Sequence, residues 1–315
     1  MVSDIIDYTD DRNIDGVLLS LDYEKAFDTA EHAFLFEYLN VFNFGPDFRK
    51  WIQIMYTNSE VCIQNNGHLS EHFYPSRGVK QGCPISAMLF ILIVEAFAIS
   101  IRNNNNIEGI QIDYNGNKID LKISQYADDT IIILTNMEMI KETLLEIDKF
   151  AQISGLKLNI GKTIGIRLGP NKDNIGTFNG IQITNEPIKY LGLFIGHDKI
   201  KCNNLNWDEK LLKAKKELLK WNCRYVTIWG KIVVLKTLII SKCIYLMMNT
   251  TPDKDVIKKL ERMCFKFVWG NKDRIRRVIT YSKISKGGLN MINPTTFCQS
   301  LKATWIKSLF FKRMG

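Results

Sequence analysis

Two adjacent aspartates at the tip of a predicted hairpin constrain the fold of this chain more than any other feature. Residues 119–126 alternate apolar and polar side chains, Asp128 and Asp129 follow at a turn, and residues 130–134 return as a β-rich strand. Like charges a few ångströms apart repel, so in a low dielectric each carboxylate raises the pKa of the other unless a cation intervenes. The pair therefore indicates either a solvated turn or a divalent-cation site, and a lone Asp-Asp pair more often marks a turn.

A third acid ends a second predicted strand. Residues 16–22 form a short apolar run that closes on Asp22, which is typical of a buried strand that delivers a carboxylate at its carboxyl end. Mg²⁺ prefers hard oxygen ligands, usually a few carboxylates together with substrate phosphates. We therefore expect Asp22 to lie beside Asp128, with the two carboxylates no more than about 8 Å apart if they share metal ions.

The remaining pattern predicts an α+β fold. Helical spacing is expected at 31–40, 48–56, 84–101 and 137–153. Strands are expected at 61–64, 72–75, 164–168 and 189–196. Apolar residues surround the helix that begins at Pro84, so we expect this helix to be central and packed on a sheet. The order of the elements predicts helices on one face of a small antiparallel sheet.

The charge balance changes sign along the chain. Residues 1–200 hold 17 Lys and Arg against 26 Asp and Glu, a balance of −9, whereas residues 201–315 hold 25 against 7, a balance of +18. The basic part begins with a predicted amphipathic helix whose apolar stripe is Trp207, Leu211, Ala214, Leu218 and Trp221. Such a surface suits the phosphates of nucleic acid, although the charge alone is equally consistent with a solvated lysine-rich face. We expect a domain boundary near residue 200.

Several classes of protein are not expected. The longest apolar run, residues 85–94, is well short of the ~20 residues that span a bilayer, so no membrane partner is predicted. The first residues lack the basic and apolar pattern of a secretory signal, which predicts an intracellular protein of the nucleus or cytoplasm. The seven cysteines are scattered without a CxxC or CxxH pair and predict neither disulfides nor structural zinc. The sequence makes no prediction of the oligomeric state.

Five segments, in this order, resemble the motifs of a polymerase palm. They are SLDYEKAFD (20–28), RGVKQGCPISAMLF (77–90), QYADDT (125–130), GLKLNIGKT (155–163) and KYLGLFIG (189–196). The set resembles the reverse transcriptases of non-LTR (LINE-type) retrotransposons, and residues 205–310 resemble the thumb of that family, including FVWG (267–270) and SKGGLNMIN (285–293). The resemblance implies a palm with partial fingers in residues 1–200 and a basic helical thumb in residues 201–315.

The resemblance also implies an activity. Members of this family are RNA-directed DNA polymerases, which add deoxynucleotides (dNTPs) to the 3′ end of a DNA primer on an RNA or DNA template. Asp22, Asp128 and Asp129 match the catalytic, metal-binding acids of the family. Two Mg²⁺ ions, with Mn²⁺ as an alternative, would lie about 3.5–4 Å apart, one activating the 3′-hydroxyl and the other stabilising the leaving pyrophosphate.

Further residues match the nucleotide and primer contacts of the family. The resemblance assigns nucleotide binding to Tyr23, Phe27, Gln81, Gly82 and Lys162, and support of the primer end to Leu191 and Gly192. Phe27 matches the ring under the sugar that leaves no room for a 2′-hydroxyl; without the resemblance, a core aromatic is the simpler interpretation. Lys162 matches a lysine sometimes assigned to protonate pyrophosphate, a role that needs proximity and a suitable pKa; a solvated lysine is the alternative. For Arg77 two roles remain open: it contacts a phosphate, or it is a salt-bridge partner.

The chain departs from the family pattern in two respects. Ala87 stands where the family commonly has a proline. Only 15 residues precede Gly16, with Arg12 as their one arginine and no template-binding block, so we expect a truncated protein derived from a retrotransposon. Two functions therefore remain open from the sequence: an RNA-directed DNA polymerase, or a catalytically inactive remnant that only binds nucleic acid.

Overall fold

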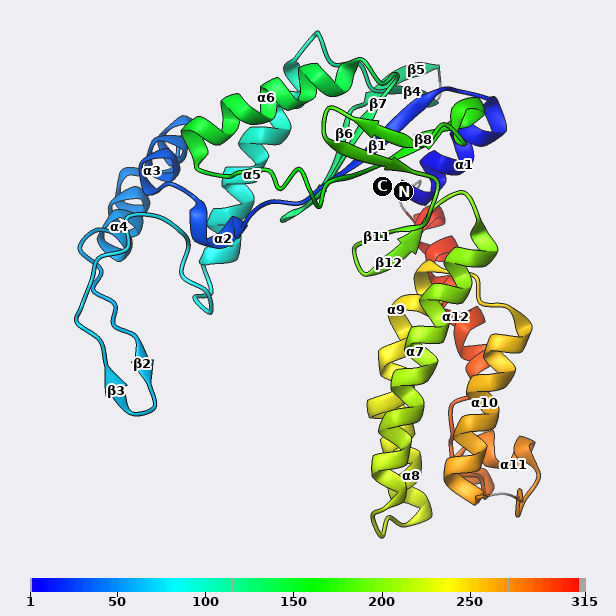
Figure 1. Ribbon diagram of the computed structural model, residues 1–315. Helices are drawn as coiled ribbons and strands as arrows, with labels where there is room; N and C mark the ends of the chain where they lie inside the picture. The colour runs from blue at the N-terminus through cyan, green and yellow to red at the C-terminus, as the bar shows by residue number, and fades with distance from the viewer. Residues whose placement is uncertain (1, 115, 271, 312–315) are drawn as a thin grey trace. The chain divides into compact units, whose positions relative to one another are not determined.

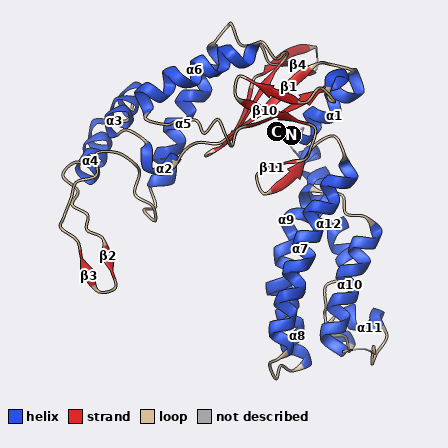
Figure 2. Cartoon of the chain, in the orientation of Figure 1, coloured by secondary structure: helices blue, strands red, loops and turns tan. Residues whose placement is uncertain are grey.

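The structure is a computed structural model that describes residues 2–114, 116–270 and 272–311 (Figure 1). The chain divides into two compact units. The amino-terminal unit comprises the residues up to Leu191 together with Ile195–His197, and the carboxy-terminal unit comprises Gly192–Phe194 and the residues from Asp198 onward. Strands are concentrated in the first unit, while the second consists largely of helices (Figure 2). The α+β class predicted from the sequence is confirmed.

A six-stranded sheet organises the amino-terminal unit, with the strand order β6-β7-β1-β8-β10-β9. The strands are β1 (Gly16–Leu21), β6 (Ile123–Tyr126), β7 (Asp129–Leu134), β8 (Ile164–Leu168), β9 (Gly176–Phe178) and β10 (Ile181–Thr184). The central strand β1 is antiparallel to both β7 and β8. The sheet is predominantly antiparallel as expected, but β8 and β10 pair in parallel. The sequence did not indicate this pair, because β9 and the 3₁₀ turn Gly169–Asn171 intervene between its strands.

Helices cover the face of the sheet on which Val17, Leu19 and Leu21 point. The helices of this unit besides α1 are α2 (Ala26–Thr29), α3 (His32–Val41), α4 (Pro46–Tyr56), α5 (Ser86–Asn103) and α6 (Met139–Ser154). Helix α5 contributes the fully buried Phe90 and Phe97 to the same core as the strands, so it is the central helix that the sequence predicted. Helix α1 (Val2–Arg12), which the sequence did not indicate, lies against β8 and buries Ile5 and Ile6.

Two helical stretches in the described part of the chain are long and apolar enough to cross a bilayer. They are α5 and the continuous run Ile228–Asn249. About half of each stretch is buried inside the protein. Core helices of soluble proteins pass the same test of length and composition, so this finding is weak evidence for a membrane span.

Three short hairpins correct the expected strand boundaries. Strands β2 (Gln64–Asn65) and β3 (His68–Leu69) replace the longer strands expected at 61–64 and 72–75, which meet only through a bridge between Val61 and Phe73. The strand expected over 119–126 is interrupted at Lys122, so that β5 (Asn117–Leu121) pairs with β4 (Ile110–Tyr114) and β6 pairs with β7. At this break Lys122 is buried, and its Nζ donates to the carbonyls of Arg102 and Asn104 at 3.1 and 2.9 Å.

The third hairpin replaces the single strand expected over 189–196. It consists of β11 (Ile188–Tyr190) and β12 (Leu193–Ile195). Leu191 and Gly192 form the turn, with φ angles of 48° and 76°. Two successive positive φ angles reverse the chain within two residues, which the β-rich sequence does not reveal.

The carboxy-terminal unit is built on a long helix, α7 (Lys199–Asn222). The following elements are α8 (Ile228–Val234), a π-helical segment (Leu235–Ile240), α9 (Ser241–Asn249), α10 (Lys254–Trp269), α11 (Arg277–Tyr281), the 3₁₀ turn Ile284–Lys286 and α12 (Pro294–Phe311). Four of the five residues of the predicted apolar stripe on α7 are buried, and Trp221 packs partly buried against the same core. Asp198 caps α7, its carboxylate accepting the backbone N–H of Lys201 at 2.9 Å.

Candidate active site

The pairing of β1 with β7 brings together acids that lie about a hundred residues apart in the sequence. Leu21 is paired with Thr130, so Asp22 and Asp129 follow at adjoining positions at the same end of the two strands. Asp128 sits in the two-residue turn between β6 and β7, beside Ala127, whose φ of 52° permits the tight reversal. Both strands are buried up to this point, whereas Asp128 and Asp129 are exposed. The fold therefore presents these carboxylates at the end of an otherwise apolar sheet.

The electrostatics of these acids indicate uncompensated negative charge. Burial raises the pKa of Asp129 above its ordinary value, and the charges of Asp128 and Asp22 raise it further. Lys162 is the nearby cation, with its Nζ 4.0 Å from Oδ2 of Asp22. Among the described residues, no three His, Cys, Asp or Glu side chains are gathered closely enough to hold a metal ion by themselves. The acids nevertheless suit a cation that also takes oxygen ligands from a substrate, because a positive charge would offset the repulsion that raises the pKa of Asp129.

The segment that carries Lys162 is tied to the backbone of Asp22. The amide of Asn159 donates to the carbonyl of Asp22 at 2.7 Å. Lys162 in turn follows in a turn closed by the bond from its amide to the carbonyl of Asn159 at 3.1 Å. Lys162 itself is exposed, with 72% of its side chain accessible. The structure thus places Lys162 beside Asp22, and its role in proton transfer stays a prediction.

Tyr23 and Phe27, two of the residues assigned to nucleotide binding, both contribute to the core. The Tyr23 ring is buried and lies edge-on to Phe97 at 6.4 Å, and burial raises the pKa of its hydroxyl. Its side chain is therefore part of the core, and the nucleotide contact assigned to Tyr23 stays a prediction. Phe27 is only half-buried and stacks on Phe90, with ring centroids 4.3 Å apart. Phe27 thus has one packed face, and its partial exposure is compatible with the sugar contact that the sequence comparison implied.

A loop that precedes α5 forms a second wall beside the segment of Phe27. The amide of Val79 donates to the carbonyl of Phe27 and the amide of Gly78 to the carbonyl of Ala30, both at 2.7 Å. His32 Nε2 donates to the carbonyl of Gly78 at 2.8 Å. Gly78 has a φ of +87°, and a Cβ atom there would lie 2.8 Å from the carbonyl oxygen of Asp28. Only glycine fits this close approach of two backbones.

Gln81 and Gly82 lie at the end of this loop. The Gln81 amide nitrogen donates to Oδ1 of Asp28 at 2.9 Å, which orients the side chain. Gly82 has a φ of +85° and open space around the position of a Cβ atom. Sequence reasoning missed Asp28 and His32 as supports of this loop. The available signal for Asp28 was its position directly after Phe27 in the segment SLDYEKAFD.

Three residues from the sequence analysis remain: Leu191 and Gly192, assigned to the primer end, and Arg77, for which two roles were left open. Leu191 is half-buried and Gly192 exposed, and together they form the turn of the β11–β12 hairpin described above. Arg77 is exposed, and its backbone forms a bridge with Glu31. This arrangement favours neither of the two roles considered for the Arg77 guanidinium, a phosphate contact or a salt bridge.

The central strands β1 and β7 are antiparallel, carry acids at the same end and pack on helices. A glycine-containing loop leads into α5. These features define a polymerase palm. The family described as reverse transcriptase (RNA-dependent DNA polymerase) matches residues 3–195. The chain belongs to this family. The family recognition made from the five sequence motifs is thereby confirmed.

The relatives of the chain are proteins of transposable elements. An uncharacterised 149 kDa protein of transposon TX1 from Xenopus laevis is 26% identical over 298 residues, which cover 93% of this chain and 22% of that protein. The retrovirus-related Pol polyprotein of the type-2 retrotransposable element R2DM from Drosophila melanogaster is 29% identical over 199 residues, which cover 59% of this chain and 18% of that protein. The chain thus spans about a fifth of the length of these two relatives.

Solved structures of telomerase are also similar to the chain. The apo telomerase of Candida tropicalis has a TM-score of 0.48 and 13% identity, covering 88% of this chain and 47% of that chain. The telomerase of Candida albicans in complex with a fragment of telomeric RNA has a TM-score of 0.47 and 10% identity, covering 93% of this chain and 53% of that chain.

Replacing Asp128 with asparagine is expected to stabilise the metal-free protein at neutral pH. Folding raises the pKa of Asp129, so its contribution to stability is present at acid pH and is lost as the pH rises through the folded-state pKa. Asparagine at position 128 removes one of the charges that cause this loss. The gain in the free energy of unfolding should be about 0.3–1 kcal/mol, because solvent screens exposed charges.

Urea unfolding with a chelator at neutral and at acid pH measures this gain. The expected gain disappears at a pH that protonates the carboxyl groups. Asp173→Asn, at an exposed position in the loop after β8, is the matched control and should leave stability unchanged. An Asp128→Asn protein that is less stable than the original at neutral pH would show that the acids do not repel one another.

Proposed function

We propose that the chain is the polymerising part of a retrotransposon-derived RNA-directed DNA polymerase, with Asp22, Asp128 and Asp129 as its catalytic acids. The observation that carries the proposal is the register of β1 and β7, which makes Asp22 and Asp129 neighbours. The pKa of Asp129, which is raised by burial and further by the charges of Asp128 and Asp22, is consistent with this arrangement. The substrates would be an RNA or DNA template, a DNA primer and dNTPs.

The same acids would hold divalent cations, Mg²⁺ or Mn²⁺. When bound, such a pair of ions stabilises both the attacking and the leaving oxygen of a phosphoryl transfer. The residues around the acids would bind and position the substrates. Lys162, exposed beside Asp22, would neutralise or protonate the leaving pyrophosphate. Gln81, oriented by Asp28, would contact the incoming nucleotide, and the bare backbone of Gly82 would allow the template to approach.

Primer extension tests the proposal directly. The full chain is incubated with an RNA template, an annealed DNA primer, dNTPs and Mg²⁺, and extended primers are resolved on a gel. We expect extension that a chelator abolishes, and a loss of at least ~100-fold on Asp22→Asn or Asp129→Asn, since each removes a charge from the metal site. Asp173→Asn is the matched control and should extend normally.

A second measurement separates loss of metal from loss of structure. Mg²⁺ should raise the unfolding temperature of the original chain and leave that of Asp22→Asn unchanged, because a ligand stabilises only the state that binds it. Absence of extension together with nucleic-acid binding would favour the alternative function, a catalytically inactive remnant that only binds nucleic acid. Undiminished extension by both aspartate variants would exclude these residues as catalytic.

Phe27→Ala is expected to relax discrimination against ribonucleotides. Phe27 stacks on Phe90 with one face and is half-buried, so removing the ring opens space next to the segment of Asp22. A 2′-hydroxyl would then fit, and the ratio of kcat/KM for deoxy- over ribonucleotides should fall by roughly 10- to 100-fold. Single-nucleotide extension kinetics measure the ratio. If the variant loses stability but keeps its discrimination, Phe27 is a core residue and not a gate.

The carboxy-terminal unit would act as a nucleic-acid-binding thumb. A groove of about 400 Å³ lies between α7 and the helices that follow α8. Its lysines, called here the basic groove, are Lys210, Lys213, Lys216, Lys220 and Lys242. Glu217 is the acid that lines it, and the apolar floor includes Leu238 and Ile239. Regularly spaced ammonium groups along one helix suit a row of phosphates, which they can bind without reading sequence.

Removing the basic groove is expected to weaken binding and its dependence on salt. The quadruple variant Lys210→Ala, Lys213→Ala, Lys220→Ala and Lys242→Ala should lower affinity for a primer–template duplex by about 10- to 1,000-fold at low salt. The slope of log affinity against log salt should become shallower by up to about 3. Fluorescence anisotropy at several salt concentrations measures both.

The matched control removes the same charge from another helix of the unit. Lys254→Ala, Lys258→Ala, Lys259→Ala and Lys266→Ala all lie at exposed positions of α10. An equal loss in both quadruple variants would show that net charge, rather than the groove, governs binding. Unchanged affinity in the groove variant would show that these lysines are a solvated face.

A further inference from the structure

Helix α7 has an exposed side that the core does not use and that shares Lys216 with the basic groove. Leu205, Leu212 and Leu219 are accessible to 38%, 53% and 57%. A spacing of seven residues is close to two helical turns, so the three side chains form a line along one side of the helix. The buried stripe that contains Trp207 and Leu211 faces a different direction. The line of leucines, with the charged residues between them, is called here the leucine face.

The charges between the leucines are arranged with opposite sign in the two halves. Asp208 and Glu209 lie between Leu205 and Leu212, whereas Lys215 and Lys216 lie between Leu212 and Leu219. All four charged residues are exposed. Reversing the direction of the helix about Leu212 exchanges the acidic pair for the basic pair and Leu205 for Leu219. The face is therefore complementary to its own reversed copy.

We propose that the leucine face binds the leucine face of a second copy of this chain, with the two α7 helices antiparallel and a twofold axis at Leu212. In this arrangement Leu212 meets Leu212 of the second copy, and Leu205 meets Leu219. Asp208 then faces Lys215 of the second copy on one flank of the leucine line, and Glu209 faces Lys216 on the other flank. A twofold interface of this kind is isologous, so every contact away from the axis occurs twice, and the contact between the two Leu212 side chains occurs once.

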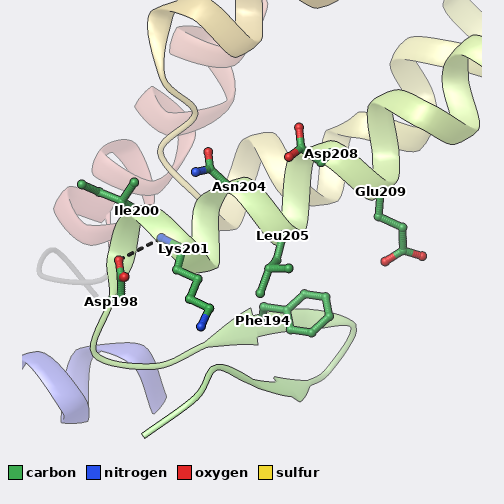
Figure 3. A pocket seen from close by; sticks show the side chains of 8 residues that line it. All are labelled: Phe194, Asp198, Ile200, Lys201, Asn204, Leu205, Asp208 and Glu209. Carbon is green, nitrogen blue, oxygen red and sulfur yellow. Dashed lines mark hydrogen bonds between the residues drawn. The ribbon is translucent and has the colours of Figure 1, made fainter.

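A hollow at the start of α7 offers space for the incoming leucine (Figure 3). Its volume is about 500 Å³, and its apolar lining is Phe194, Ile200 and Leu205. Leu205 lies next to the ring of Phe194, and Asp208 and Glu209 follow along the helix (Figure 3). The rest of the lining is polar and consists of Asp198, Lys201, Asn204, Asp208 and Glu209. The apolar side chains of the hollow match Leu219 of the second copy, and its acids Asp208 and Glu209 match Lys215 and Lys216.

Charge decides the direction of the pairing. Two parallel α7 helices in register would set Asp208 and Glu209 against the same acids of the second copy, and the lysines against lysines. Like charges across a helix pair oppose association, and opposite charges select orientation. The pairing partner is thus an identical helix in the antiparallel direction. Since α7 is about 36 Å long at 1.5 Å per residue, the interface is of modest size and the dimer should dissociate on dilution.

The first experiment measures the mass of the full chain, freed of nucleic acid, by sedimentation over a range of concentrations. The mass should rise from the 36.4 kDa of the single chain toward twice that value. Leu212→Glu sets two carboxylates against each other on the axis and should raise the dissociation constant at least ~10-fold. Leu145→Glu, at an exposed leucine of α6, is the matched control and should dimerise normally. Thermal unfolding verifies that each variant is folded.

The second experiment exchanges the charges. The double variants Asp208→Lys with Glu209→Lys, and Lys215→Glu with Lys216→Glu, should each be monomeric because like charges face one another. Mixing the two should give a dimer of one chain of each kind. A monomeric original chain at all concentrations, or a mixture that associates no better than either variant alone, would overturn the proposal.

Discussion

The antiparallel pairing of β1 with β7 is the interaction on which the candidate active site depends. Strand β1 is buried along nearly its whole length, so a slip of one residue would turn Val17 and Leu19 away from the core and is strongly disfavoured. The same register that buries these residues sets Asp22 beside Asp129 at the strand ends. The hydrophobic core thus determines which acids become neighbours. The raised pKa of Asp129, caused first by burial and then by repulsion from Asp128 and Asp22, is a consequence of that placement.

The second wall of the site, the loop before α5, is held against the segment of Phe27 largely by backbone contacts. The loop before α5 approaches the segment after β1 so closely that Gly78 has no room for a side chain. Backbone bonds from Gly78 and Val79 and the amide of Gln81 hold the two segments together. A loop that is already held at several points loses little conformational entropy when a ligand binds to it. This small loss is the physical basis of preorganisation. Asp28 connects the two segments through its carboxylate, which accepts a hydrogen bond from Gln81.

Helix α7 shows how one amphipathic helix can carry three surfaces. Trp207 and Leu211 face the core of the carboxy-terminal unit, the basic groove runs along a second side, and the leucine face occupies the third. The sequence indicated the first two through the apolar stripe and the lysines. The third was not recognised, because exposed leucines can be told from buried ones only once the direction of the core is known. Single exposed leucines are common on protein surfaces. Three leucines in a line, with acids in one half and lysines in the other, form a face that is complementary to its own reversed copy.

The sequence by itself determined the α+β class, the central helix α5, the strands that end at Asp22 and Asp129, and the family. Those features follow from local periodicity and from motifs whose residues are adjacent in the chain. Tertiary structure alone decided the parallel pair β8–β10 and the break at Lys122, since both involve partners distant in sequence. The turn at Leu191 is local, but its positive φ angles cannot be read from a β-rich sequence. It also decided that the ring of Tyr23 belongs to the core and that Asp28 supports Gln81. A side chain's role depends on what surrounds it, and the burial of one face against another is settled only when the chain has folded.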